Sequence, residues 1–159
     1  MAGRRYSWGA WTLAALTLTM ASGACSAPDQ SRARSQALIA ELKQKNVPGL
    51  PDPLTDEQAK EIDVARSGKG QWFVEKGCFA CHSVSVYGVK SYTQIGPDLS
   101  TAVEDVQSRF GKNIDDFWRE PVGTMMMVRS DLIKLTPEET ALALEKLKAA
   151  FADYKAGTH

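Results

Sequence analysis

The sequence predicts an all-α fold of three to five helices. Segments with apolar residues at helical spacing recur along the chain, and two of them open with capping-box signals, at residues 55–58 and 136–139. No strand–helix–strand pattern surrounds the most distinctive motif, at residues 78–82. The length of 159 residues suits one domain with appendages. With 19 basic and 19 acidic side chains, the formal net charge is zero, so the composition does not favour nucleic acid as a partner.

Residues 1–24 have the features of a signal peptide. Arg4 and Arg5 precede an uncharged apolar run over residues 8–20, and small residues at 22–24 form a cleavage region. The run is too short and too rich in threonine for a membrane-spanning helix. We therefore expect the mature chain to be exported from the cytoplasm.

Cys25 follows the signal directly, and the junction resembles a bacterial lipobox with Ser22 where leucine is usual. The resemblance implies that Cys25 is lipidated, which would anchor the protein to a membrane and place it in the periplasm or at the cell exterior. The alternative is ordinary cleavage after Ala24 or Ala27, which would leave Cys25 free or absent.

Residues 25–54 predict a lipid-anchored tether and a short helix ahead of the main domain. The stretch 26–32 is polar, and the apolar pattern over 31–45 predicts a helix that ends before Pro48. This helix would either pack over the main domain or act as a docking arm for a partner.

The main domain, residues 55–159, opens with a helix from the first capping box to Arg66. Glycines within 67–70 end it, and a second helix over 70–76 turns Trp72 and Phe73 inward. This second helix leads directly into the motif that organises the chain.

That motif is Cys78-Phe79-Ala80-Cys81-His82, the attachment signature of a c-type haem. Residues three apart share one face of a helical turn, so both thiols can bond to the vinyl groups of one macrocycle. His82 follows directly and can give its imidazole to the iron. The sequence thus predicts haem c as cofactor, held by Cys78, Cys81 and His82.

Two other kinds of functional site also contain a CxxC pair. A zinc site needs further cysteine or histidine ligands, and this chain offers only Cys25 and the terminal His159. A thioredoxin-like dithiol needs a βαβ pattern, which the sequence lacks. Haem attachment therefore remains the preferred interpretation.

Residues 96–99, Gly-Pro-Asp-Leu, lie shortly after the motif and resemble the Gly-Pro-x-Leu segment of class I monohaem cytochromes c. The resemblance covers about residues 60–155 and implies the cytochrome c fold around one haem. It also implies that the carbonyl of Pro97 accepts a hydrogen bond from the free nitrogen of His82. Such an acceptor fixes a metal-bound imidazole and raises its basicity.

Three further helices complete the expected domain. Residues 101–109 and 115–118 are predicted to wrap the haem, with aromatic side chains lining its pocket. Thr136 and Pro137 open the last helix, on which Leu144, Leu147 and Phe151 recur at helical spacing. By resemblance, this helix crosses the helix over 70–76.

Residues 121–127, Pro-Val-Gly-Thr-Met-Met-Met, resemble the loop whose methionine binds the other face of the iron in this family. The Gly-Thr-x-Met form selects Met126, whereas Gly-Thr-Met selects Met125, and Met127 ranks third. In an extended loop, neighbouring side chains alternate in direction, so only one of them would face the iron. The alternative is that all three fill the core.

We expect the protein to be a one-electron carrier between redox proteins or membrane electron-transport complexes. With both axial positions filled by His82 and methionine, no substrate binds the iron, and the sequence offers no general base, nucleophile or substrate pocket, so we do not expect an enzyme. Two alternatives remain: a haem subunit of a larger oxidase or reductase, and a sensor or peroxidase-like protein with a labile sixth ligand.

Overall fold

The computed structural model describes residues 27–47 and 49–157, and all regular elements within them are helical. The seven α-helices of these residues outnumber the three to five expected, although the all-α prediction itself is confirmed. Their bounds are α1 Ala27–Gln44, α2 Asp56–Arg66, α3 Gln71–Glu75, α4 Ala102–Phe110, α5 Ile114–Arg119, α6 Thr124–Met127 and α7 Pro137–Lys155. Short turns of 3₁₀-helix are η1 Cys78–Ala80, η2 Ser85–Tyr87 and η3 Leu99–Thr101, and η4 Val128–Leu132 is a π-helix.

Two helices account for the higher count: α1, which lies ahead of the five helices expected in the main domain, and α6. The methionine segment, expected to be an extended loop, instead forms α6 and continues into η4. Gly111, in the left-handed region with φ 65°, separates α4 from α5.

Helix α1 begins at Ala27, so most of the stretch expected to be a tether is helical. Pro28 and Asp29 stand in its first turn, where both residue types favour helix initiation. Asn46, with φ 57°, ends the segment, as the stop signal there predicts.

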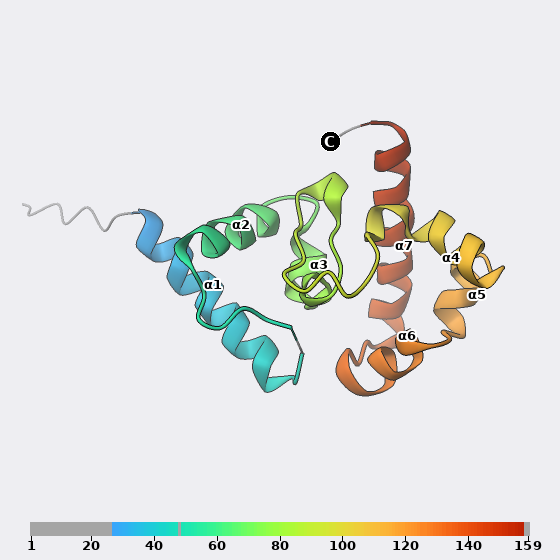
Figure 1. The fold of residues 1–159 in the computed structure, drawn as a ribbon, viewed down its shortest axis with the longest axis horizontal. Coiled ribbons are helices and arrows are strands. Elements are labelled where there is room, and N and C mark those ends of the chain that lie inside the picture. The colour runs from blue at the N-terminus through green and yellow to red at the C-terminus, as the bar shows by residue number, and fades with distance from the viewer. Residues whose placement is uncertain (1–26, 48, 158–159) are drawn as a thin grey trace, which may run out of the picture.

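Helix α1 packs against α2, and the two lie together at the left of Figure 1. The side chains of Leu38, Ile39 and Leu42 are buried in the same core as α2. Exposed ion pairs between such helices contribute at most about 1 kcal/mol each, so these buried side chains supply most of the stabilisation. Of the two roles expected for this helix, the structure shows packing. The ion pairs that join residues 27–47 to the following segment are Arg32–Asp56, Arg34–Asp63 and Lys43–Asp52.

The first capping box forms as predicted. The Thr55 hydroxyl accepts a hydrogen bond from the Gln58 amide at 3.2 Å, and the Gln58 side chain accepts one from the Thr55 amide at 3.0 Å. Helix α2 ends at Arg66, and the five-residue helix α3 follows, with Phe73 buried and Trp72 half-buried.

Helix α7 stands upright beside the centre of the molecule in Figure 1, with α4 and α5 on one side of it and residues 78–99 on the other. It packs mainly against η2, η3, α4 and α5. The expected crossing with residues 70–76 is therefore not a main contact of α7. Instead, ion pairs join the two flanks of α3 to opposite ends of α7: Lys69–Asp153 and Lys76–Glu139.

One hydrophobic core serves the whole described chain, with contributions from α1, α2, α3, α4, α5 and α7. Within residues 27–47 and 49–157, no helix combines the length and apolar character needed to cross a bilayer.

Candidate haem site

The three residues of the CxxCH motif that carry chemistry lie on a single helical turn. The amides of Cys81 and His82 both donate hydrogen bonds to the carbonyl of Cys78, at 3.2 and 2.9 Å. Gly77 enters this turn with φ 77°, a conformation that costs little only for glycine. Both thiols and the imidazole therefore come from one short, hydrogen-bonded turn, which is formed by η1 and the two residues that follow it.

The thiols of Cys78 and Cys81 are half-buried against the core and are not joined by a disulfide. Burial raises the pKa of Cys78 to about 12 and also raises the pKa of Cys81. Both groups are therefore protonated at neutral pH. Reactive dithiols have lowered pKa values, so this environment does not favour the thioredoxin-like alternative.

The imidazole of His82 is held by the backbone of the Gly-Pro-Asp-Leu segment. Its Nδ1 lies 2.7 Å from the carbonyl oxygen of Pro97, so the Nδ1–H tautomer donates a hydrogen bond there. Burial lowers the pKa of His82, whereas the Pro97 carbonyl and the Asp98 carboxylate raise it, and the net shift is downward. The ring is thus neutral at pH 7. Its Nε2 atom has no hydrogen-bond partner within the described chain.

Gly96 is a site residue that the sequence analysis did not single out. A Cβ atom at this position would lie 2.2 Å from Cε1 and 2.3 Å from Nδ1 of His82. Only glycine therefore allows the backbone to pass this close to the imidazole face. The signal that could have found it is its place directly before Pro97 in the resembled segment.

Residues 96–99 are fastened to the haem motif by backbone hydrogen bonds. The amide of Gly96 donates to the carbonyl of Cys81, and the amide of Leu99 donates to the carbonyl of Ser83, both at 2.8 Å. The position of the Pro97 carbonyl between these two bonds is consequently fixed relative to His82.

Asp98 adds a further anchor next to this segment. Its Oδ1 accepts hydrogen bonds from the amides of Ser85 at 3.1 Å and Ser100 at 2.9 Å. Burial would raise the pKa of Asp98, but the hydrogen bonds from Ser85 and Ser100 outweigh it and hold the pKa below its usual value. The carboxylate is therefore charged over the whole neutral range.

Helix α1 and the segment that follows it support the motif from behind. A Cβ at Gly77 would meet Val47 at 3.2 Å and Leu42 at 3.3 Å, so these two side chains pack directly behind the turn. On the same side, the Thr93 hydroxyl donates a hydrogen bond to the carbonyl of Ala80 at 2.5 Å. Residues before the recognisable domain thus take part in building its site.

The three methionines are not equivalent in the structure. Because α6 is helical, its side chains do not alternate as they would in the extended loop expected from the sequence. Met125 is half-buried and packs against the core, whereas Met126 and Met127 are 57% and 56% exposed. Met125 is therefore the inward-facing member of the group.

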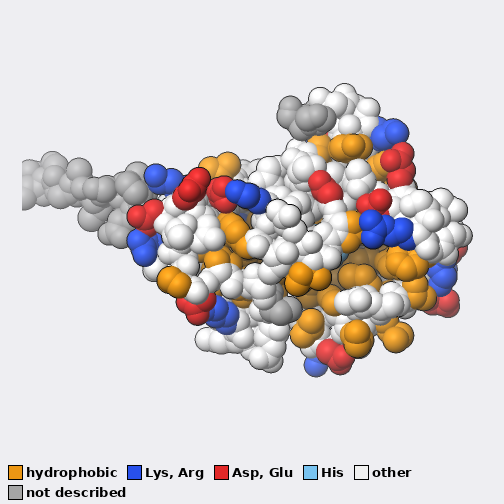
Figure 2. Space-filling model, in the orientation of Figure 1, with side chains coloured by type: hydrophobic (Ala, Val, Ile, Leu, Met, Phe, Trp, Pro, Cys, Tyr) orange, Lys and Arg blue, Asp and Glu red, His pale blue; other side chains and the backbone are white. Residues whose placement is uncertain are grey.

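Figure 2 shows hydrophobic side chains gathered around a recessed area above α6 and in front of α7, beside residues 78–99. The core also carries half-buried apolar side chains that are only partly covered, among them Leu99, Trp118, Val122, Met125 and Leu144. In the part of the chain that the structure describes, no three His, Cys, Asp or Glu side chains gather closely enough to hold a metal ion between them.

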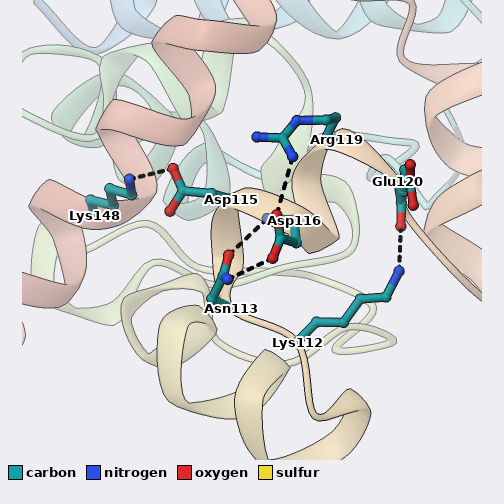
Figure 3. Close-up of polar contacts among 7 residues, drawn as sticks. All are labelled: Lys112, Asn113, Asp115, Asp116, Arg119, Glu120 and Lys148. Carbon is teal, nitrogen blue, oxygen red and sulfur yellow. Dashed lines mark hydrogen bonds and ion pairs between the residues drawn. The ribbon is translucent and has the colours of Figure 1, made fainter.

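A separate groove lies between α4, α5 and α7, and none of the predicted site residues lines it. Val103, Ile114 and Phe151 form part of its apolar lining. Figure 3 shows the ion pair at its rim, in which Lys148 of α7 reaches Asp115 of α5 at 2.6 Å. Because none of the predicted site residues lines this groove, we treat it as separate from the candidate site.

The predicted lipidation site, Cys25, and the predicted signal peptide lie outside the described residues. No family model matches this chain, and neither a curated protein nor a solved structure is similar enough to match it.

Proposed function

We propose that this protein is a one-electron carrier with one haem c bonded covalently to Cys78 and Cys81. The observation that carries the proposal is the state of His82: its Nδ1 is held by the Pro97 carbonyl, and its Nε2 has no protein partner. A neutral imidazole with one nitrogen fixed and the other available is the form that binds a metal ion.

The donor set around this imidazole fits the proposed group. Two protonated, unpaired thiols lie on the same turn, as thioether formation requires. Apolar side chains surround a recess beside residues 78–99 (Figure 2), and such a recess suits a flat, largely apolar macrocycle. When bound, the haem would supply reversible one-electron exchange between ferrous and ferric iron.

The protein's own residues would set the properties of that exchange. Pro97 and Gly96 fix the orientation of His82, and the Pro97 carbonyl raises the basicity of its ring. Met125, as a neutral thioether, favours the reduced state and raises the reduction potential relative to a second histidine. Its burial, compared with the exposure of Met126, supports Met125 as the sixth ligand.

A denaturing gel stained for haem tests covalent attachment, together with a pyridine haemochrome spectrum of the purified protein. We expect one haem to stay with the denatured chain, and Cys78→Ala or Cys81→Ala to lower the holoprotein yield sharply. Loss of all haem from the denatured wild type would reject the proposal. Carbon monoxide binding to the reduced wild type at neutral pH would instead favour the sensor or peroxidase-like alternative.

We also propose that the carrier is exported and anchored to a membrane through Cys25, where it would exchange electrons with membrane complexes or other redox proteins. The support is the signal-like segment followed directly by this cysteine. Metabolic labelling with a fatty acid should tag the wild type and leave Cys25→Ser unlabelled. An unlabelled wild type that begins at Ser26 or later would reject the anchor while leaving the electron-carrier proposal intact.

A further inference from the structure

Arg129 joins the methionine segment to the rest of the protein. It lies in η4, which continues α6 without a break, and its guanidinium donates a hydrogen bond to the backbone carbonyl of Trp118 in α5. The same group also lies over the Trp118 indole, with Cζ 5.1 Å from the ring centroid. A planar guanidinium can make both contacts at once, which a lysine ammonium cannot do with the same geometry.

Trp118 is itself fixed to the core. Its indole Nε1 donates a hydrogen bond to the carbonyl of Thr140 in α7 at 2.8 Å, and its side chain is half-buried against the hydrophobic core. A contact with Trp118 therefore connects η4 to both α5 and α7.

The methionine segment has few other restraints. Helix α6 has no side-chain hydrogen bond at its N-terminus, and the Ser130 hydroxyl bonds only to the nearby Met127 carbonyl. Within residues 121–135, which the structure describes in full, Arg129 is the residue whose side chain donates a hydrogen bond to another element. Apart from the core contacts of Val122 and Met125, the segment is thus joined to its neighbours through Arg129.

Arg129 is four residues after Met125, and residues at this spacing share a helix face. Consistent with this, both side chains are partly buried, whereas Met126 and Met127 point to solvent. We propose that Arg129 is a positioning residue: through Trp118 it holds α6 so that Met125 faces the sixth coordination position of the haem iron. This inference rests on the proposed function.

The test compares Arg129→Gln with a matched control, Arg119→Gln. Arg119 lies on α5 next to Trp118, its side chain is 71% exposed, and it pairs only with Asp116 on the same helix at 3.1 Å, as Figure 3 shows. Both substitutions remove one positive charge by the same chemical change. Arg129→Lys keeps the charge and loses the combined stacking and hydrogen bonding.

Two properties are measured on the full-length protein. Amide hydrogen exchange over residues 124–132 reports how firmly the segment is held, whether or not haem is bound. The near-infrared methionine–iron band of the oxidised protein and carbon monoxide binding to the reduced protein report the ligand. We expect Arg129→Gln to accelerate amide exchange roughly tenfold, to weaken the band and to bind carbon monoxide. Arg129→Lys should lie between Arg129→Gln and the wild type in these measurements. Arg119→Gln should behave as the wild type does.

Each result decides the inference. Unchanged exchange in Arg129→Gln would overturn it, because the contact would then not hold the segment. Faster exchange with an unaltered band and no carbon monoxide binding would also overturn it, because the segment would then not position the ligand. A wild type without covalent haem would reject the proposed function, and a wild type without the band would reject its methionine ligand. Either result would also reject this inference, even if the exchange measurement showed that Arg129 holds the segment.

Discussion

The two sides of the proposed haem differ in how firmly the protein builds them. The histidine side, residues 77–100, contains buried side chains such as Phe79, Val84 and Val89. The methionine side, residues 121–135, contains no buried side chain. Backbone hydrogen bonds also connect distant parts of the histidine side, whereas those of the methionine side are local.

This difference has a consequence for ligand exchange. Regions with few buried apolar contacts open at lower free energy than regions inside a core. His82 is therefore held in place by the protein alone, whereas the position of the proposed methionine ligand depends on weaker contacts. We expect perturbations of the histidine side to affect folding and haem loading, and perturbations of the methionine side to affect ligation.

The largest effect should come from Leu42→Ala. This side chain is 1% exposed and packs behind Gly77, so its truncation leaves a cavity under the turn that carries Cys78, Cys81 and His82. We expect a loss of about 2–5 kcal/mol in the free energy of unfolding and a lower haem content. Urea unfolding measures the change in free energy, and the haem-to-protein ratio measures the haem content. A loss below 1 kcal/mol would show that α1 does not support the site.

Gly96→Ala should have the next largest effect. The added methyl group would overlap the His82 ring, so the ring must move and its hydrogen bond to Pro97 must lengthen. We expect a loss of about 1–3 kcal/mol in stability and poorer haem retention. Gly68→Ala is the control, because no atom lies within 4 Å of its added Cβ. Equal stability of the two variants would contradict the close contact with His82.

A smaller effect concerns pH. The pKa of Asp98 is lower in the folded protein than in an unfolded chain, so its charged form stabilises the fold above the unfolded pKa. This contribution is lost as the pH falls through the folded pKa, below about pH 4. Unfolding measured between pH 3 and 6 should show a shallower decline for Asp98→Asn than for the wild type.

The parts of this structure that the sequence predicted are those with local signals. Both capping boxes join residues three apart in the chain, so their sequence pattern is sufficient to identify them. The turn at residues 78–82 is equally local. The contact between His82 and Pro97 spans 15 residues and was expected only because of the resemblance.

The parts that escaped prediction depend on distant contacts. Nothing near Leu42 indicates that it packs behind Gly77, and nothing near Arg129 indicates that it meets Trp118. The methionine segment was expected to be extended because the resembled family has a loop there, yet its residues form a short helix. In each case, the tertiary fold decided between local conformations that the sequence alone allows.

The central claim, an iron held between His82 and an inward-facing methionine, is tested most directly by the near-infrared methionine–iron band in three single variants. We expect Met125→Ala to abolish the band, lower the reduction potential and admit carbon monoxide. Met126→Ala and Met127→Ala, which change exposed side chains, should keep the band. Loss of the band only in Met126→Ala would transfer the ligand role to that residue. An unaltered band in the triple variant would contradict methionine ligation altogether.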